Sequence, residues 1–277
     1  MLGAGNYSTV RSGSKREAIK KVPLLTGNAV FLNESFIIPQ TKSCTRTIKY
    51  KKTYVENNEG YIVMERAKCN LVECLLKRKG AAMAENKAAH LFYLICQSVK
   101  ELHESRIAHL DLKLDNFLLT NEGHVKICDF GCSVNFSQPE DMIDHPNFKI
   151  GSPMYCAPEI ESKGKFCPMQ ADMWSLGVIL HLLLTDCFPT SEPVSYITED
   201  TIYFENLENR SDEAKDLVAN LLFFDPTLRY SMEEVLNSPW LVKHLSHNVP
   251  DVLPCEDKPK FKQVLKHLLT CCKDVLF

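Results

Sequence analysis

The hydrophobic pattern of the chain changes its period once, near residue 65, and this change limits the folds available to it. Before it, short runs such as 17–22 and 60–66 have the length and residue types of β-strands. After it, apolar residues recur at helical spacing, as in 84–105, which is typical of helices packed on a core. We therefore predict an α+β fold with a small β-rich lobe, about residues 1–65, and a larger helical lobe, about residues 68–242.

The composition fits a globular protein and points to no partner. The chain has 277 residues, of which 45% are hydrophobic, and this is enough for a large core. Its formal net charge is -3, so it has no excess of positive charge that would attract nucleic acid or an anionic membrane, and we expect neither partner. The longest apolar run, 174–184, is too short to cross a bilayer and contains His181, so it predicts a buried helix.

The cysteines indicate a reducing compartment. The 12 cysteines are scattered, no C-x-x-C pair occurs, and we see no secretory leader. We expect reduced, mostly buried thiols in an intracellular protein, cytoplasmic, nuclear or both. A zinc site or a disulfide framework is the less favoured alternative.

Two later segments differ from the helical lobe around them. Residues 132–156 are rich in Ser, Asp, Pro and Asn, and they predict a long surface loop, which in a compact domain is usually functional or disordered. Residues 243–277 form a C-terminal tail, in which 261–276 carries an apolar stripe at helical spacing. We expect this amphipathic helix to pack on the body of the protein. A regulatory partner bound at the 261–276 helix is the alternative.

The first chemical signal is the glycine pattern G-x-G-x-x-S-x-V in "LGAGNYSTV", residues 2–10. Glycines at such positions let backbone amides approach phosphate oxygens without interference from a Cβ atom. Taken alone the pattern is weak, since an ordinary glycine turn has the same composition. Ser8 also replaces a third glycine and makes the tip of the loop less permissive.

A lysine follows in the strand-like run Ala18-Ile19-Lys20. A lysine on a strand is usually a solvated surface residue unless a carboxylate and a phosphate site lie near it. Glu34, on an amphipathic stretch at about 28–38, is the best candidate for that carboxylate. Glu17 and Glu56 are the other acids that we considered on this lobe.

The strongest signal is a set of polar residues in a fixed order. "IAHLDLKLDN" (107–116) places Asp111, Lys113 and Asn116 between apolar residues, and "ICDFG" (127–131) places Asp129 after a strand-like run. Each motif alone could be a turn, but the ordered set with its spacings is specific.

Three further motifs complete the pattern: "GSPMYCAPE" (151–159), "ADMWSLGVIL" (171–180) and "DPTLRYS" (225–231). With them, the chain resembles a eukaryotic-type protein kinase over about residues 2–242, which implies the bilobal fold of that family. The segment 211–241 is further similar to the calmodulin-dependent kinase group. "HLDLK" and "DFGCS" are locally similar to the Mos kinases.

The resemblance implies a cleft that binds ATP and Mg²⁺. Gly3 and Gly5 would cover the phosphates, and Lys20 would hold the α- and β-phosphates. Asn116 and Asp129 would hold the magnesium ions, and Glu34 would orient Lys20. The implied nucleotide-binding residues are Leu2, Gly3, Ala4, Gly5, Asn6, Tyr7, Ser8, Val10, Ala18, Lys20, Glu34, Glu65, Ala67 and Leu118.

The same resemblance assigns the catalytic residues. Asp111 would accept the proton of a protein hydroxyl, and Lys113 would neutralise charge on the transferred phosphoryl group. The lysine, together with the pair Ser152-Pro153, is the pattern of serine/threonine kinases. Structural ion pairing is implied for Glu159 with Arg229.

The resemblance also places groups around the adenine ring. Val10, Ala18 and Leu118 would sandwich the ring, while the backbone at Glu65 and Ala67 would read its edge. Met64 would lie at the back of this pocket. Asp172 would brace the backbone around His109.

The sequence departs from the family pattern at two places. The first strand is abbreviated before Gly3, which leaves a pseudokinase that binds nucleotide or partners as the main alternative to an active enzyme. A small-molecule phosphotransferase is less favoured because it would not be expected to carry the motifs of 151–159 and 225–231. Leu110 replaces the usual arginine before Asp111, so we expect activity that needs no phosphate on the 132–156 loop. The expected partner is a protein substrate.

Overall fold

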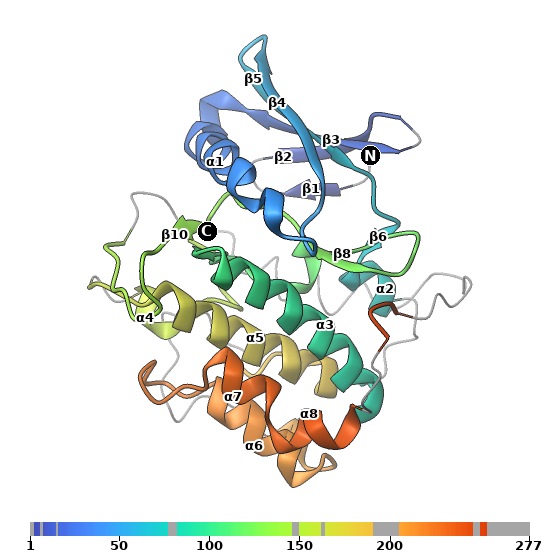
Figure 1. The fold of residues 1–277 in the computed structure, drawn as a ribbon, viewed down its shortest axis with the longest axis vertical. Helices are drawn as coiled ribbons and strands as arrows, with labels where there is room; N and C mark the ends of the chain where they lie inside the picture. The colour runs from blue at the N-terminus through green and yellow to red at the C-terminus, as the bar shows by residue number, and fades with distance from the viewer. Residues whose placement is uncertain are drawn as a thin grey trace.

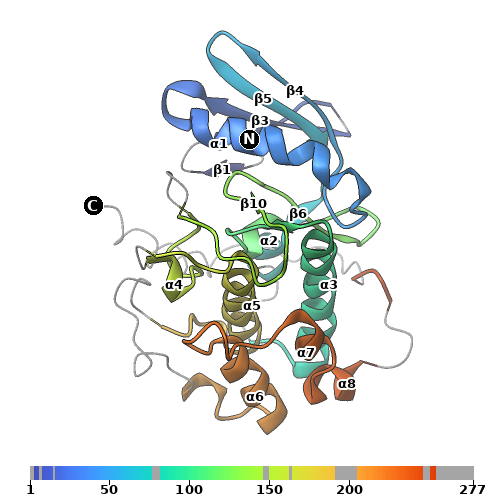
Figure 2. The same cartoon turned by 60° about the vertical axis from the view of Figure 1, so that its left-hand side comes forward.

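The computed structural model describes residues 3–5, 8–14, 16–76, 82–145, 150–161, 164–190, 205–245 and 250–253. In Figure 1 a β-rich lobe stands above a helical lobe, and Figure 2 shows the same division after a turn of the molecule. This is the bilobal α+β arrangement that the change of hydrophobic period predicts. The 261–276 helix expected from the sequence lies outside the described residues.

The upper lobe is built on one antiparallel sheet with the strand order β1-β2-β3-β5-β4. β3 alternates between half-buried and buried residues, whereas β5 is buried continuously from Gly60 to Met64. Helix α1 (Leu24–Ile37) packs on β3 and β5. The strands are β1 (Gly3–Gly5), β2 (Ser8–Ser12), β3 (Glu17–Pro23), β4 (Tyr50–Glu56) and β5 (Glu59–Glu65).

Close packing of α1 on this sheet requires a glycine at position 60. A Cβ atom built on Gly60 would come within 2.5 Å of the Phe31 ring, which is buried on α1. Any larger residue there would push α1 away from β5. The position of the helix that carries Glu34 is therefore set by backbone contact.

The lower lobe is organised around two long helices, α3 (Glu85–Glu104) and α5 (Pro168–Thr185), which lie side by side in Figures 1 and 2. α5 is buried along nearly its whole length, as expected for a helix that is apolar all round. Shorter helices surround this pair: α2 (Leu71–Leu76), α4 (Pro158–Glu161), α6 (Asp212–Leu221), α7 (Met232–Leu236) and α8 (Pro239–His244), with 3₁₀ turns at Ile38–Ser43, Leu114–Asn116 and Glu205–Leu207.

Short strands lie between the two lobes. β8 (Phe117–Leu119) pairs with β9 (Val125–Ile127) and with β6 (Cys69–Asn70). A second small ladder joins β7 (Ile107–Ala108) to β10 (Val134–Asn135). These strands position the polar residues of two sequence motifs. Asp111, Lys113 and Asn116 follow β7, and Asp129 follows β9.

Several sequence predictions agree with these elements. The helices expected at 84–105 and 174–184 are α3 and part of α5, and the strands expected at 17–22 and 60–66 correspond to β3 and β5. The amphipathic stretch expected at 28–38 is α1, which begins earlier, at Leu24. None of the cysteines in the described ranges forms a disulfide. None of the helices in those ranges is long and apolar enough to cross a membrane.

Two expectations were incomplete. β4 was not predicted, because its residues are mostly exposed and show no apolar alternation. The segment 132–156, expected as a surface loop, instead includes β10 and several buried residues in its described part. Ser133, Phe136, Ile150 and Cys156 are all buried. Buried residues near both ends therefore attach this polar segment to the rest of the protein.

Candidate active site

Three charged groups from distant parts of the chain meet between the lobes. Lys20 Nζ on β3 lies 2.7 Å from Glu34 Oε2 on α1 and 2.7 Å from Asp129 Oδ1, which follows β9. The Lys20 and Glu34 side chains are almost completely buried, whereas 39% of the Asp129 side chain is exposed. Lys20 is therefore held by two carboxylates, and one of them, Asp129, is partly open to solvent.

Burial and charge act against each other in this cluster. Burial alone would lower the pKa of Lys20, but Asp129 and Glu34 outweigh it and raise the pKa above its ordinary value. Burial raises the pKa of Glu34 to about 7, with a further contribution from Asp129, although Lys20 opposes the shift. For Asp129 burial also acts upward, but Lys20 holds its pKa below the ordinary value. Asp129 is thus the carboxylate that stays ionised.

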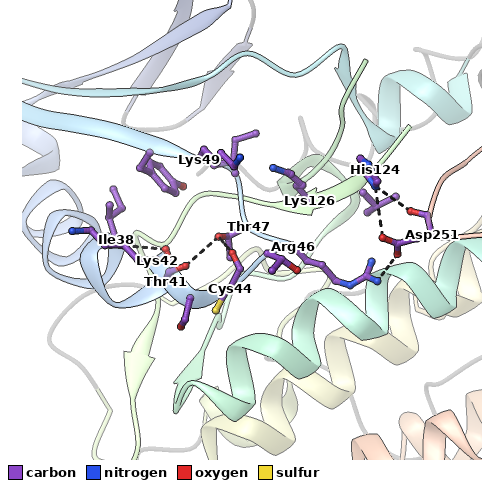
Figure 3. Close-up of a pocket in the computed structure, with 15 residues that line it drawn as sticks. Ile38, Thr41, Lys42, Cys44, Arg46, Thr47, Lys49, His124, Lys126 and Asp251 are labelled. Carbon is purple, nitrogen blue, oxygen red and sulfur yellow. Dashed lines mark hydrogen bonds and ion pairs between the residues drawn. The ribbon is translucent and has the colours of Figure 1, made fainter. Parts of the chain in front are cut away.

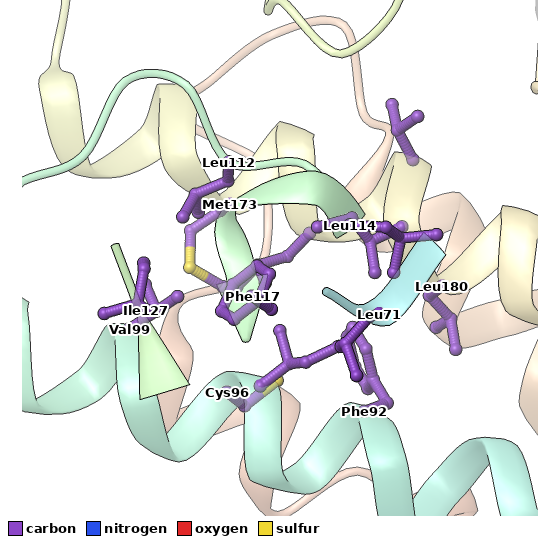
Figure 4. Close-up of a cluster of buried hydrophobic side chains, with 14 of the residues drawn as sticks. Leu71, Phe92, Cys96, Val99, Leu112, Leu114, Phe117, Ile127, Met173 and Leu180 are labelled. Atoms are coloured by element: carbon purple, nitrogen blue, oxygen red, sulfur yellow. The ribbon is translucent and has the colours of Figure 1, made fainter. Parts of the chain in front are cut away.

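In the motif 107–116, buried leucines alternate with the half-buried Asp111 and Lys113. Leu110, Leu112 and Leu114 are all buried. Figure 4 shows Leu112 and Leu114 within a cluster formed with side chains of α3, α5, β8 and β9. Asp111 and Lys113 alternate with these leucines and are only half-buried, so packing the leucines leaves the two polar side chains on the opposite, outer side. Burial of the leucines therefore determines the orientation of Asp111 and Lys113.

Asp111 is held by two neighbours at once. Lys113 Nζ donates to Asp111 Oδ2 at 2.9 Å, and the Ser152 hydroxyl donates to Asp111 Oδ1 at 2.8 Å. Lys113 Nζ also donates to Ser152 Oγ at 2.7 Å. The carboxylate, ammonium and hydroxyl groups form a closed triangle, and this triangle joins the 107–116 motif to the 151–159 motif.

Asn116 completes this loop and fits the chemistry of a cation ligand. Its Nδ2 donates to the Asp111 carbonyl at 2.8 Å and is 3.2 Å from Asp111 Oδ2. The amide nitrogen is used in these contacts, so the amide oxygen is the Asn116 atom left to ligate a metal. Hard divalent cations such as Mg²⁺ prefer carboxylate and amide oxygens, which Asp129 and Asn116 supply. The residues present therefore fit the magnesium ions implied by the resemblance.

Buried contacts fix the backbone before Asp111. Asp172, on α5, accepts hydrogen bonds from the backbone N–H groups of His109 and Leu110, both at 2.8 Å. The N–H of Asp111 donates to His109 Nδ1 at 3.2 Å, so His109 Nε2 carries the proton that reaches the Cys128 carbonyl at 3.0 Å. His109 thereby links this loop to the segment before Asp129.

The expected nucleotide residues occupy both lobes. β1 and β2 form a hairpin in which Gly3 pairs with Val10 and Gly5 pairs with Ser8, and Ala4 lies between them on β1. On the sheet, Ala18 pairs with Met64 and both are buried. Val10 and Leu118 are half-buried, Glu65 ends β5 with Ala67 just beyond it, and Leu2, Asn6 and Tyr7 lie outside the described residues.

The two structural contacts expected from the sequence are present. Arg229 Nη1 lies 2.7 Å from Glu159 Oε1, and the Arg229 side chain is completely buried. Asp172 also contacts His103 Nε2 at 2.9 Å. These contacts tie α4 and α3 to the centre of the lower lobe.

Comparison with known proteins identifies the family. The protein kinase domain family matches residues 1–241. The chain belongs to the protein kinase family. Among its relatives are the mouse serine/threonine-protein kinase DCLK3, 32% identical over 87% of this chain, and the probable serine/threonine-protein kinase fhkC of Dictyostelium discoideum, 30% identical over 88%. The SNF1-related protein kinase catalytic subunit alpha KIN12 of Arabidopsis thaliana is 36% identical over 68% of this chain.

The kinase chain is much shorter than these relatives. The matches cover 32% of DCLK3, 44% of fhkC and 37% of KIN12. The shared part is thus the kinase domain of longer proteins.

Two residues of the kinase site were not identified from the sequence. Asn33, next to Glu34 on α1, donates from Nδ2 towards the carbonyls of Gly131 at 3.0 Å and Ser133 at 2.9 Å, with that of Phe130 at 3.4 Å. The Tyr50 hydroxyl accepts the N–H of Asp129 at 3.2 Å. Asparagine is a weak helix former, so an asparagine next to Glu34 on a predicted helix could have indicated that its side chain makes a specific contact.

The pKa of Glu34 leads to a prediction about stability. Its value of about 7 in the folded protein, against an ordinary 4.5, means that the folded state holds more protons than the unfolded state between these pH values. The free energy of unfolding should therefore fall as pH rises from about 4.5 to about 7, and Glu34→Gln should remove this slope. Urea unfolding of both proteins across this window measures the difference. Parallel pH profiles would contradict the prediction.

Asn33 leads to a prediction about the loop that carries Asp129. Asn33→Asp keeps the size of the side chain but removes both amide hydrogens and places a carboxylate against carbonyl oxygens. We expect faster amide hydrogen exchange over residues 128–135. Asn28→Asp, at an exposed position of the same helix, is the matched control. Equal exchange in the two variants would show that Asn33 does not hold the loop.

Proposed function

We propose that this chain is a serine/threonine protein kinase that transfers the γ-phosphate of ATP to hydroxyl groups of protein substrates. The observation that carries the proposal is the convergence of Lys20, Asp129, Asn116, Asp111 and Lys113 around one cleft, with the contacts described above. The relatives named above are serine/threonine kinases by name, which supports the same specificity here.

Each residue has a physical role in this proposal. Lys20 would bind the α- and β-phosphates, and Glu34 would keep its ammonium in place. Asp129 and Asn116 would hold Mg²⁺, which when bound neutralises phosphate charge. Asp111 would accept the proton of the substrate hydroxyl.

Ser152 supports the role of Asp111. Its hydroxyl donates to Asp111 Oδ1 at 2.8 Å, so this carboxylate oxygen is already placed to accept a hydrogen bond from an aliphatic hydroxyl. Lys113 donates to the other oxygen and would stabilise the negative charge that develops close by. An aliphatic hydroxyl on a short side chain suits this arrangement, which favours serine or threonine over tyrosine.

The pseudokinase alternative is less well supported. A chain that only binds partners would not need to hold Asp111, Lys113 and Ser152 in one hydrogen-bonded triangle.

Membership of the calmodulin-dependent kinase group remains a proposal that rests on the 211–241 segment. An intracellular location, cytoplasmic or nuclear, likewise remains a prediction from the cysteines, and a regulatory partner at 261–276 remains one from the helical stripe.

Removal of the proposed catalytic groups should abolish transfer without unfolding the protein. We expect Asp111→Asn, Lys20→Met and Asp129→Ala each to lower the rate about a hundredfold or more, because each removes a charge needed in the transition state. The measurement is transfer of labelled phosphate to serine, threonine and tyrosine peptides, with folding checked by circular dichroism. Asp115→Asn, an exposed carboxylate of the same loop, is the control. Unchanged transfer in the folded Asp111→Asn variant would refute the proposal.

Leu110 leads to a prediction about regulation. An arginine here could pair with a phosphate on the activation loop, but Leu110 is uncharged and buried at 4% exposure. Phe148, near the position where such a phosphosite would align, has no hydroxyl group and lies outside the described residues.

We therefore expect the kinase to be active with no phosphate on 132–156. After phosphatase treatment, with loss of phosphate verified by mass spectrometry, peptide phosphorylation should continue at a similar rate. A loss of activity that returns when residues of 132–156 are phosphorylated again would show that the loop requires phosphate.

A further inference from the structure

A pocket of about 660 Å³ lies behind the active site, where the segment between α1 and β4 meets the β8–β9 turn (Figure 3). Its wall comes from the 3₁₀ turn Ile38–Ser43, from the following residues up to Tyr50, and from His124–Lys126. Asp251, from the segment that follows the helical lobe, lies at one end. The pocket therefore touches both lobes and the C-terminal tail.

The lining of this pocket is basic. Lys42, Arg46, Lys49 and Lys126 face it, together with His124, whereas Asp251 is the acidic residue of the lining. Two acids outside the lining offset part of this charge, because Glu65 lies 2.6 Å from Lys126 and Glu101 Oε1 lies 3.7 Å from Arg46 Nε. The side chains of Lys42 and Lys49 make no ion pair with any residue that the structure describes. The net positive charge favours a ligand that carries carboxylates.

The C-terminal segment 250–253 already places a carboxylate in this pocket. The Asp251 carboxylate accepts from Arg46 Nη2 and lies 3.7 Å from His124 Nδ1 (Figure 3). His124 Nδ1 is also 3.3 Å from the Asp251 carbonyl. An ion pair as exposed as this one contributes little alone, because 57% of the Asp251 side chain is open to water.

Backbone contacts reinforce the ion pair. His90 Nε2, on α3, is 2.7 Å from the Pro250 carbonyl, and the Leu253 N–H donates to the Gly123 carbonyl at 2.9 Å. Gly123 has a positive φ of 93°, and a Cβ atom there would lie 2.7 Å from the Leu253 carbonyl oxygen. The turn therefore needs glycine both for its own conformation and to let the tail approach.

Arg46 lies at the point where the upper lobe is fixed to the lower one. The Arg46 carbonyl accepts from the Ile127 N–H at 2.8 Å, and the Ile48 N–H donates to the Ile127 carbonyl at 2.9 Å. Glu101, on α3, accepts from the Arg46 N–H at 2.9 Å and from the Thr45 hydroxyl at 2.8 Å. α1 runs through the 3₁₀ turn directly into this anchored segment, so the anchor constrains the helix that carries Glu34.

We propose that this basic pocket is a docking site for the chain's own segment 250–253, which carries Asp251, and that docking braces the anchor of α1. The tail joins Arg46 on the upper side to His124 and Gly123 on the lower side, and so restrains movement between them. Several weak contacts hold the segment, so docking is reversible and can be lost when one charge is changed. The docking claim stands on contacts alone, whereas the effect on catalysis rests on the kinase function proposed above.

A charge reversal in the full chain tests the docking. Asp251→Arg places a cation against Arg46 and His124, whereas Asp251→Glu keeps the carboxylate. We expect Asp251→Arg to exchange amide hydrogens several-fold faster in 44–50 and 123–127 than the unchanged protein, and Asp251→Glu to keep their protection. Glu213→Arg, which disrupts the surface pair with Lys243, is the matched control and should leave both segments unchanged.

The possible results separate docking from function. Unchanged exchange in Asp251→Arg, or equally fast exchange in Asp251→Glu, would overturn the docking site. If docking is lost as expected, Asp251→Arg should raise the KM for ATP, because α1 no longer holds Lys20 firmly, and Asp251→Glu should leave it unchanged. A normal KM in a protein whose tail is released would overturn the bracing role. Failure of the kinase proposal itself would appear as absence of transfer in the unchanged protein, with the exchange results still valid.

Discussion

One buried ammonium group links the two lobes at the active site. The Lys20 side chain is almost completely buried, and a charge in that position is tolerated only if partners replace its water. Glu34 supplies one partner from the upper lobe and Asp129 supplies another from the lower one. The distance between α1, β3 and the β9 loop is therefore constrained by electrostatics as well as by packing.

In this cluster, the attraction of Lys20 for each carboxylate is opposed by burial and by the repulsion between the two carboxylates. Two carboxylates share one cation, and burial raises the pKa of Glu34 to about 7, while Asp129 stays ionised. A second cation near Asp129 would relieve the repulsion between the two carboxylates. The charges of this cluster thus favour the binding of a cation on the exposed side of Asp129.

Sequence alone predicted the parts of this site where the chemistry is carried by residue type and spacing. The order of Lys20, Asp111 and Asp129 was readable because few other folds need these groups at those intervals. Glu34 was harder, because any nearby acid could have filled the role until the fold of α1 was known. β4 was not found because its residues are mainly exposed, so hydrophobic alternation could not mark it. Asn33 was not found because its partners are backbone carbonyls, which every residue carries.

Leu110 and Asn33 explain how the two loops can be held without a bound phosphate. Leu110 has a positive φ of 60°, a conformation that costs energy for a leucine, and it is fixed by its buried side chain and by Asp172. Asn33 reaches the loop after Asp129 from the opposite side, through neutral amide hydrogen bonds. A phosphate-dependent loop uses charge that can be added or removed, whereas apolar burial and amide contacts are permanent. If activity needs no phosphate on 132–156, as proposed above, control can act on the position of α1, which the segment between α1 and β4 joins to residues 250–253.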